Sequence, residues 1–242
     1  MRRFYFSQIP SINETFFVPE DQVSHLSRVL RVNTGDILEA SNGSGQIFEL
    51  SIIHIDKENI QLKVLSSKFG SEKALHSVAF IGELKNDAMD NTISLLAEHG
   101  IQKIIPFFAK RSIPKYDLKQ LTKKQERRQK IANEAIKKVG GLYPCQVMES
   151  ISFKDIEHSL ANISQKIIFW EEECAPSQNL NNINYNKDHA FFIGPEGGFS
   201  QKEIDQLLFW KCQSYSLGTR ILRAPQAAAA AVAIIRYLTE NQ

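Results

Sequence analysis

The chain has 242 residues, and its 29 Lys and Arg against 27 Asp and Glu give a formal net charge of only +2. Its 43% hydrophobic and 23% charged residues are ordinary globular values, which exclude a wholly disordered chain and a fibrous repeat. No stretch approaches the roughly 18–20 apolar residues of a membrane span, and Met1–Ser7 holds no apolar signal segment. We therefore expect a cytoplasmic globular protein of one large or two modest domains.

The three cysteines, Cys145, Cys174 and Cys212, are far apart, with no C-x-x-C pair and no histidine cluster beside them. This dispersal argues against a zinc site and is typical of reduced thiols in the cytosol. We expect each cysteine to be a small, half-buried side chain, and we expect no metal.

The first 72 residues have the pattern of a small, mostly β domain. Strands are predicted at residues 4–6, 15–18, 37–40, 47–53 and 60–65. The turn Asn42-Gly43-Ser44-Gly45 makes the third and fourth of these a hairpin. One helix opens at Pro19, and Val23, Leu26 and Leu30 share its apolar face. A unit of this kind closes most economically as a barrel, which leaves no exposed strand edge.

After a linker at residues 68–73, strands and helices alternate along the chain. Strands are predicted at residues 78–81, 104–108, 167–170, 190–193 and 215–217, and helices at residues 89–97, 118–140 and 225–237. Such alternation is typical of an α/β domain with a mostly parallel sheet, which we place at residues 73–242.

The segment Phe191–Ser200 joins a buried strand to a helix through a loop with three glycines. Ser200 and Glu203 form the S-x-x-E capping box that marks the start of the helix. Glycines let the backbone approach a ligand closely, and ligands bind at the carboxyl ends of parallel strands. The spacing fits neither the dinucleotide nor the nucleoside-triphosphate motif. The alternative is a purely structural turn.

The segment Leu217–Arg223 predicts a second loop that faces the same crevice. It contains a glycine and two arginines, Arg220 and Arg223, and Pro225 then suits the first turn of a helix. The alternative is a solvated arginine pair in front of a surface helix.

Charge is unevenly distributed along the chain. Residues 102–141 hold 12 Lys and Arg and 3 Asp and Glu, a local balance of +9, whereas the other residues carry −7. Most of this positive charge lies on the helix predicted at residues 118–140, where it is typical of a surface that binds phosphate. The alternative is a solvated helix face.

The paired motifs Gly194-Pro195-Glu196-Gly197-Gly198 and Leu217-Gly218-x-Arg220-Ile221-Leu222-Arg223 resemble those of the 16S ribosomal RNA uridine-N3 methyltransferases. These enzymes belong to the SPOUT class and use S-adenosyl-L-methionine. The segment His25-Leu26-x-Arg28-Val29-Leu30-Arg31 is similar to the N-terminal signature of the family, and Arg111-Ser112 is similar to its E-R-S segment. The likeness extends over nearly the whole chain.

The resemblance implies a PUA-like β-barrel RNA-binding domain at residues 1–72 and a SPOUT methyltransferase domain, with a C-terminal trefoil knot, at residues 73–242. It implies a homodimer that methylates N3 of a specific uridine in 16S rRNA, within the 30S ribosomal subunit. The expected cofactor-binding residues are Ile193, Gly194, Pro195, Glu196, Gly197, Gly198, Leu217, Gly218, Ile221, Leu222 and Arg223. The expected RNA-binding residues are Arg2, Arg3, His25, Arg28, Arg31, Arg111, Lys123, Lys124, Arg127 and Arg128.

The catalytic residues expected for this reaction are Arg223, Arg220 and Glu196. The two guanidinium groups would stabilise the negative charge that develops on the uracil oxygens. Glu196 is the nearest motif carboxylate, and it is interpreted as a proton acceptor or a cofactor contact. The alternative for Glu196 is a helix-start carboxylate stabilised by the helix dipole.

The chain departs from the family pattern at three places. Ser94-Leu95 stands where the family has Gln-Lys, Lys137-Lys138-Val139-Gly140-Gly141 replaces Glu-Gln-x-Gly-Arg, and Ala224-Pro225-Gln226 replaces Thr-Glu-Thr. Two alternatives therefore stay open. One is a non-catalytic RNA-binding protein on the same scaffold, and the other is a SPOUT enzyme with a different RNA target.

Overall fold

The computed structural model describes residues 3–24, 26–27, 30–56, 58–113, 116–170, 180, 183–184 and 187–241. The chain forms two compact units. The first consists of Met1–Glu72 with Lys137–Pro144, and the second of Lys73–Ile136 with Cys145–Gln242. Lys137–Pro144, hereafter the returning segment, is grouped with the first unit by its contacts and lies within residues 73–242, which the sequence predicts as the second domain.

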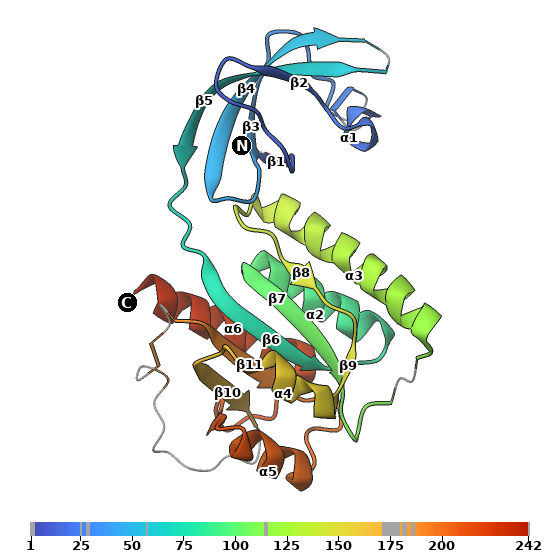
Figure 1. Cartoon of the computed structure of the whole chain (residues 1–242), viewed down its shortest axis with the longest axis vertical. Helices are drawn as coiled ribbons and strands as arrows, with labels where there is room; N and C mark the ends of the chain where they lie inside the picture. The colour runs from blue at the N-terminus through green and yellow to red at the C-terminus, as the bar shows by residue number, and fades with distance from the viewer. Residues whose placement is uncertain are drawn as a thin grey trace. The chain divides into compact units, whose positions relative to one another are not determined.

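The first unit is built on a five-stranded sheet in the order β1-β3-β4-β5-β2 (Figure 1). The elements are β1 (Arg3–Tyr5), β2 (Thr15–Phe17), α1 (Glu20–Ser24), β3 (Ile37–Ser41), β4 (Gln46–Ile55) and β5 (Ile60–Phe69). The β1–β3 pair is parallel and the other pairs are antiparallel. The strands and the hairpin predicted for this part of the chain are confirmed, although β5 extends into the expected linker.

One face of this sheet carries the core of the first unit. Along β5, Ile60, Leu62 and Val64 are fully buried, which is the period-two pattern of a strand with one buried face. Val23 and Leu26 are buried in the same cluster. The apolar face predicted for the helix therefore packs on the sheet.

The ends of the strand order are β1 and β2, which share no ladder within the described part of the chain. The described strands therefore have an order with two ends, and the closure expected of a barrel is not among their ladders. Each of the two edge strands is only three residues long. Short edge strands expose few unpaired backbone groups, which limits pairing with other chains at these two edges.

The returning segment belongs to the first unit because it is hydrogen-bonded there. The Glu72 carboxylate accepts the backbone N–H of Leu142 at 2.8 Å. The Arg3 guanidinium donates to the carbonyl of Gly140 and lies 3.5 Å from the Glu39 carboxylate. Arg3 is an expected RNA contact, but its side chain is only 20% exposed and its partners lie within the unit.

The second unit contains a parallel sheet in the order β12-β10-β11-β6-β7-β8, with β9 also paired to β7 (Figure 1). Its strands are β6 (Leu75–Gly82), β7 (Ile101–Phe108), β8 (Gln146–Val147), β9 (Ile151–Ser152), β10 (Gln165–Phe169), β11 (His189–Ile193) and β12 (Gln213–Tyr215). Its helices are α2 (Asn86–Glu98), α3 (Leu118–Val139, of which residues 137–139 are grouped with the first unit), α4 (Ile156–Ser159), α5 (Gln201–Phe209) and α6 (Ala224–Glu240). The predicted α/β class is confirmed.

Helices cover both faces of the parallel sheet. The core on one face includes side chains of α2, α3 and α6, and the core on the other includes side chains of α4 and α5. Along β6, Ala79 and Ile81 point into the first core and Phe80 into the second. Burial on both faces explains why the strands of this unit are nearly continuous apolar runs in the sequence.

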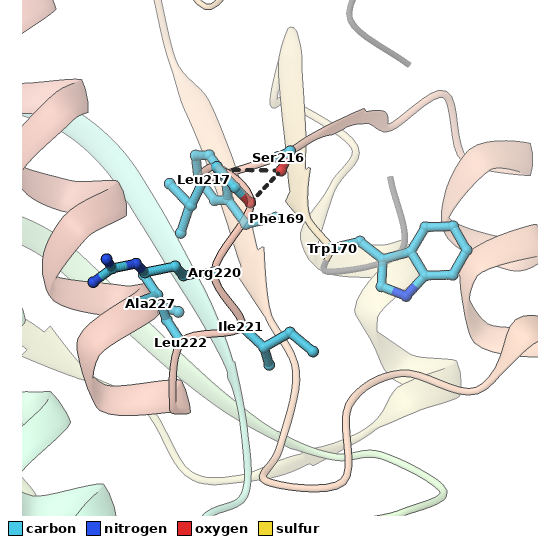
Figure 2. A pocket seen from close by; sticks show the side chains of 9 residues that line it. Phe169, Trp170, Ser216, Leu217, Arg220, Ile221, Leu222 and Ala227 are labelled. Atoms are coloured by element: carbon cyan, nitrogen blue, oxygen red, sulfur yellow. Dashed lines mark hydrogen bonds between the residues drawn. The ribbon is translucent and has the colours of Figure 1, made fainter. Parts of the chain in front are cut away.

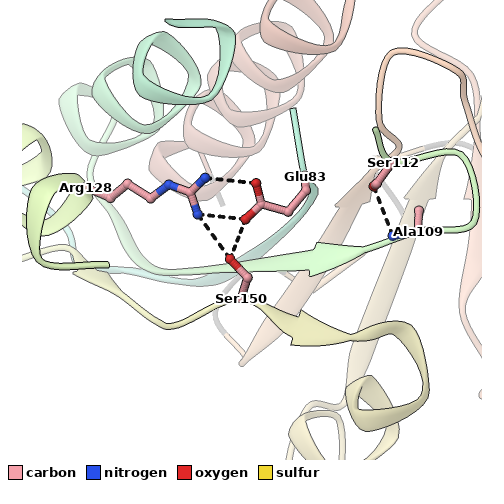
Figure 3. A network of polar contacts seen from close by, with 5 residues as sticks. All are labelled: Glu83, Ala109, Ser112, Arg128 and Ser150. Carbon is pink, nitrogen blue, oxygen red and sulfur yellow. Dashed lines mark hydrogen bonds and ion pairs between the residues drawn. The ribbon is translucent and has the colours of Figure 1, made fainter. Parts of the chain in front are cut away.

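A buried ion pair joins α3 to the end of β6 (Figure 3). The Arg128 guanidinium donates to both carboxylate oxygens of Glu83, at 2.7 and 2.9 Å. Ser150 bonds to both partners, and Arg128 is only 3% exposed. This position corrects the expectation that Arg128 contacts RNA, because the side chain lies in the interior with its charge already paired.

The two cysteines in the described residues, Cys145 and Cys212, are buried, and burial raises the pKa of each thiol to about 12. Cys174 lies outside the described residues.

Within the described ranges, no group of three or more His, Cys, Asp or Glu is placed to hold a metal ion. Among the described helices, none is long and apolar enough to cross a membrane.

We expect Arg128→Ala to lower the free energy of unfolding by about 3–5 kcal/mol, because it leaves the Glu83 carboxylate buried without its charge partner. Arg127→Ala is the matched control. It removes an arginine whose side chain is 61% exposed and paired with Asp90, so it should change the free energy by no more than about 1 kcal/mol. Urea unfolding of both variants measures the difference. Equal losses would contradict the structural role of the buried pair.

Candidate active site

The two motif loops follow β11 and β12, which lie on either side of β10 at the carboxyl edge of the parallel sheet. β6 and β11 are adjacent, and the chain leaves β6 toward β7 but leaves β11 toward β12, on the opposite side. Ligands bind at such a reversal of strand order, outside the carboxyl ends of the strands. The loops after β11 and β12 both lie at this position.

A pocket of about 450 Å³ opens between these loops. Motif residues in its lining are Ile193, Gly194, Pro195, Glu196, Gly198, Ile221, Leu222 and Arg223. The structure therefore brings most of the predicted cofactor residues together. Sequence reasoning missed Ala88, Asn91, Phe169 and Ala227 as lining residues. Of these, Phe169 ends β10 beside β11, so the rule that ligands bind at strand ends was the available signal.

A second, smaller hollow of about 50 Å³ adjoins the pocket and shares Phe169, Ile221, Leu222 and Ala227 with it. Leu217, Gly218 and Arg220 line this hollow. Figure 2 shows the side chains of Arg220 and Trp170 on opposite sides of the loop. Ser216 closes the turn, because its Oγ accepts the backbone N–H of Gly218 and donates to the carbonyl of the same residue, both at 3.1 Å.

Close backbone packing fixes the position of the glycine-rich loop, residues 194–198. A Cβ atom at Gly82, the last residue of β6, would lie 2.5 Å from the backbone nitrogen of Pro195. Gly198 adopts a φ of +67° and donates its N–H to the carbonyl of Pro195 at 2.8 Å. Glycine is therefore needed at position 82 for the close approach and at position 198 for the turn.

Glu196 is bonded to the start of α2. Its Oε1 accepts the backbone N–H of Lys85, the N-cap residue of α2, at 2.9 Å. This geometry agrees with the interpretation of Glu196 as a helix-start carboxylate, although the helix is α2 and not α5. A carboxylate at this position satisfies an N-terminal N–H group and interacts favourably with the helix dipole.

The helix after the loop begins as the sequence predicts. The Glu203 carboxylate accepts the backbone N–H of Ser200 at 2.8 Å, which completes the expected capping box. Its other oxygen accepts the N–H of Lys110 at 2.7 Å. Arg111 donates to the carbonyls of Gly197 and Phe199 at 2.9 and 3.1 Å. Neither Gly197 nor Arg111 lines the pocket.

The remaining expected RNA contacts differ in their surroundings. Lys123 and Arg31 are exposed, and the Lys124 ammonium lies 4.3 Å from the ring centroid of Tyr116. Arg127 is exposed but pairs with Asp90 at 2.5 Å. Arg2, His25 and Arg28 lie outside the described residues.

The replaced family positions are also dispersed. Pro225 and Gln226 line the pocket. Ser94 donates to the Glu98 carboxylate at 3.2 Å within α2, and the neighbouring Leu95 is half-buried. Lys137, Lys138 and Gly141 lie in the returning segment. Of these positions, only the Ala224-Pro225-Gln226 replacement changes the pocket lining directly.

The second unit has the parallel sheet and strand-end pocket of an α/β enzyme, and comparison with known proteins identifies its family. Residues 71–236 match the RNA methyltransferase domain, and residues 18–65 match the RNA methyltransferase PUA domain. The chain therefore belongs to the RNA methyltransferase family, with an accompanying PUA domain. The family resemblance found in the sequence motifs is confirmed.

Relatives in several bacteria are similar over most of their length. The chain is 28% identical to ribosomal RNA small subunit methyltransferase E of Bacillus subtilis, covering 93% of this chain and 91% of the relative. It is 29% identical to the protein of that name in Rickettsia conorii, covering 90% and 88%. The crystal structure of the Neisseria gonorrhoeae protein of this name, bound to S-adenosyl methionine, matches with a TM-score of 0.87 and 25% identity, covering 98% of each chain.

We expect Gly82→Ala to lower the free energy of unfolding by about 1–3 kcal/mol, because its methyl group would force the Pro195 backbone away from the end of β6. Gly194→Ala is the control on the same loop. Its nearest neighbours would be at 3.2 Å, so it should have the smaller effect. Urea unfolding compares the two variants. A loss for Gly194→Ala that equals or exceeds the loss for Gly82→Ala would contradict the inferred packing.

Proposed function

We propose that this protein transfers a methyl group from S-adenosyl-L-methionine to N3 of a specific uridine in 16S rRNA, with the 30S ribosomal subunit as substrate. The observation that carries the proposal is the convergence of both motif loops on one pocket at the carboxyl edge of the sheet. The Bacillus subtilis and Rickettsia conorii relatives are both named ribosomal RNA small subunit methyltransferase E, which supports the choice of RNA.

The pocket fits the cofactor in size and chemistry. Its volume of about 450 Å³ lies within the range of roughly 300–1,000 Å³ that is typical of small-molecule sites. Phe169, Ile193 and Leu222 give it apolar walls, and Gly194 and Gly198 let the backbone approach a ligand closely. When bound, S-adenosylmethionine supplies an activated methyl group on its sulfonium.

The residues of the chain supply position and charge. The glycine-rich loop and Leu222 would hold the methyl donor in one orientation, and such positioning lowers the entropic cost of the transfer. Arg223 lines the pocket, and its guanidinium stabilises the negative charge that develops on the uracil oxygens as N3 loses its proton. Arg220 lines the adjoining hollow and adds to the positive electrostatic potential that Arg223 creates.

Glu196 is the one carboxylate in the described lining of the pocket. Since its Oε1 accepts the Lys85 N–H, its first role is to fix the loop against α2. The second carboxylate oxygen is the candidate acceptor for the N3 proton.

The proposal extends to the assembly of the protein. The first unit is an RNA-binding PUA-like domain and the second is the SPOUT domain with a C-terminal trefoil knot, with the boundary near residue 72. The protein acts in the cytoplasm as a homodimer. Exposed apolar side chains support the homodimer, since Ile221 and Tyr237 in the second unit are 83% and 66% exposed.

We expect the wild-type protein to bind S-adenosylmethionine in calorimetry and to methylate 30S subunits that lack the modification. Arg223→Ala should lower kcat about 100-fold, the typical effect of removing one charge-stabilising donor. Its free energy of unfolding should stay within about 0.5 kcal/mol, because the side chain is exposed. The control is Arg236→Ala, which removes an arginine of α6 that pairs with Glu240 outside the pocket lining.

Three results would overturn this assignment. No calorimetric binding at millimolar cofactor would favour a non-catalytic RNA-binding protein. Methylation of another RNA in place of the 30S subunit would favour a different target. Unchanged turnover by Arg223→Ala would remove that residue from the site.

We expect Lys119→Glu with Lys123→Glu to weaken rRNA binding and flatten its salt dependence. Both lysines are exposed on α3, four residues apart. The slope of log affinity against log salt should fall by about 0.7–0.9 for each phosphate that the variant no longer neutralises. Lys154→Glu with Lys202→Glu makes the same change in net charge at exposed positions outside α3. If both pairs change the slope equally, α3 is not a specific RNA contact.

A further inference from the structure

The turn after β7 and the glycine-rich loop after β11 are bonded to each other although β6 lies between their strands. The turn, residues 109–112, is closed by its own hydrogen bonds. The N–H of Ser112 donates to the carbonyl of Ala109 at 3.0 Å, and the N–H of Ala109 donates to Ser112 Oγ at 3.1 Å (Figure 3). These two bonds fix the conformation of the turn after β7, so the turn can hold the loop after β11 in place.

Three hydrogen bonds join this turn to the residues around the loop. The guanidinium Nη1 of Arg111 donates to the carbonyls of Gly197 and Phe199, at 2.9 and 3.1 Å. The backbone N–H of Lys110 donates to the Glu203 carboxylate at 2.7 Å. The contact is also close-packed, since a Cβ atom at Gly197 would lie 3.0 Å from Cβ of Arg111.

These contacts lie outside the pocket. Gly194, Pro195, Glu196 and Gly198 line it, whereas Gly197 is absent from the lining and gives its carbonyl to Arg111. The loop is thus held by Arg111 at the one glycine that does not line the pocket. A glycine-rich segment loses more conformational freedom on ordering than any other, so it binds a ligand well only if something else fixes its backbone.

We propose that Arg111 is a positioning residue for the cofactor loop and acts on the methyl donor through the Gly197 and Phe199 carbonyls. The inference rests on the proposed cofactor site. In this proposal Nη1 of Arg111 holds two backbone carbonyls, a role different from the RNA contact that the sequence predicts for this residue. A hydrogen bond from a charged donor holds a carbonyl more strongly than a neutral one.

The test compares three variants by calorimetry with S-adenosylmethionine and by binding of 16S rRNA. Arg111→Ala removes both hydrogen bonds of the guanidinium and should raise the cofactor Kd about tenfold, equivalent to about 1.4 kcal/mol of binding free energy. Arg111→Lys keeps the charge, but its ammonium lies one bond closer to the backbone than the Nη1 atom that donates both bonds, so its Kd should lie between those of Arg111→Ala and the wild type. Lys110→Ala removes an equal charge from an exposed side chain and keeps the Lys110 N–H, so its cofactor Kd should equal that of the wild type.

Each other outcome identifies what has failed. If the wild-type protein does not bind S-adenosylmethionine, the proposed cofactor site fails and the role of Arg111 fails with it. If the wild type binds and Arg111→Ala binds equally well, only the positioning role fails, even where thermal unfolding shows a loss of stability. If Arg111→Ala and Lys110→Ala weaken rRNA binding to the same degree and leave the cofactor Kd unchanged, Arg111 is an RNA contact.

Discussion

The architecture of the site depends on the close approach of two backbones at the end of β6. Because position 82 has no side chain, the loop after β11 crosses the strand end with the Pro195 nitrogen 2.5 Å from where a Cβ would be. The next residue, Glu83, is held by Arg128 in the interior, and the N–H at the start of α2 bonds to Glu196. The end of β6 is therefore fixed on one side by α3 and on the other by the loop that lines the pocket.

The buried pair also changes how the positive charge of α3 should be interpreted. Arg127 and Arg128 are neighbours in sequence, yet one is paired at the surface and the other is paired in the interior. The charges of Arg128 and Glu83 can both be buried only because Ser150 and two guanidinium nitrogens satisfy the Glu83 carboxylate. The local balance of +9 therefore overstates the charge available to RNA. The exposed lysines of α3 carry the positive charge that can interact with RNA phosphates.

Patterns that depend on short stretches of sequence were the most predictable. The capping box at Ser200, the strand ending at Ile193 and the helix predicted at residues 89–97 follow from local chemistry, and the structure contains all three. The burial of Arg128 was harder to predict, because a charge run normally indicates a solvated face. A signal was nevertheless present, since Arg128 lies four and seven residues before Ala132 and Ala135 on the buried stripe of α3.

Long-range pairings set the limit of prediction from sequence. β8 and β9 are each two residues long and form by pairing with the edge of β7. Strands this short have no periodic pattern from which the sequence could predict them. The returning segment joins the first unit through bonds to Glu72 and Arg3, which are distant in sequence. Ala88 and Asn91 line the pocket for the same reason, since only the packing of α2 against the sheet brings them there.

A glycine-rich binding loop creates a physical problem that its own sequence cannot solve. Its glycines remove the side chains that would obstruct a ligand, and they also remove the side chains that would pack the loop into one position. The position must therefore come from groups outside the motif. Here Lys85 N–H holds Glu196, Arg111 holds the Gly197 and Phe199 carbonyls, and Glu203 ties Ser200 to the turn after β7. Since these partners belong to different strand ends, the pocket retains its shape only while the whole carboxyl edge of the sheet is intact.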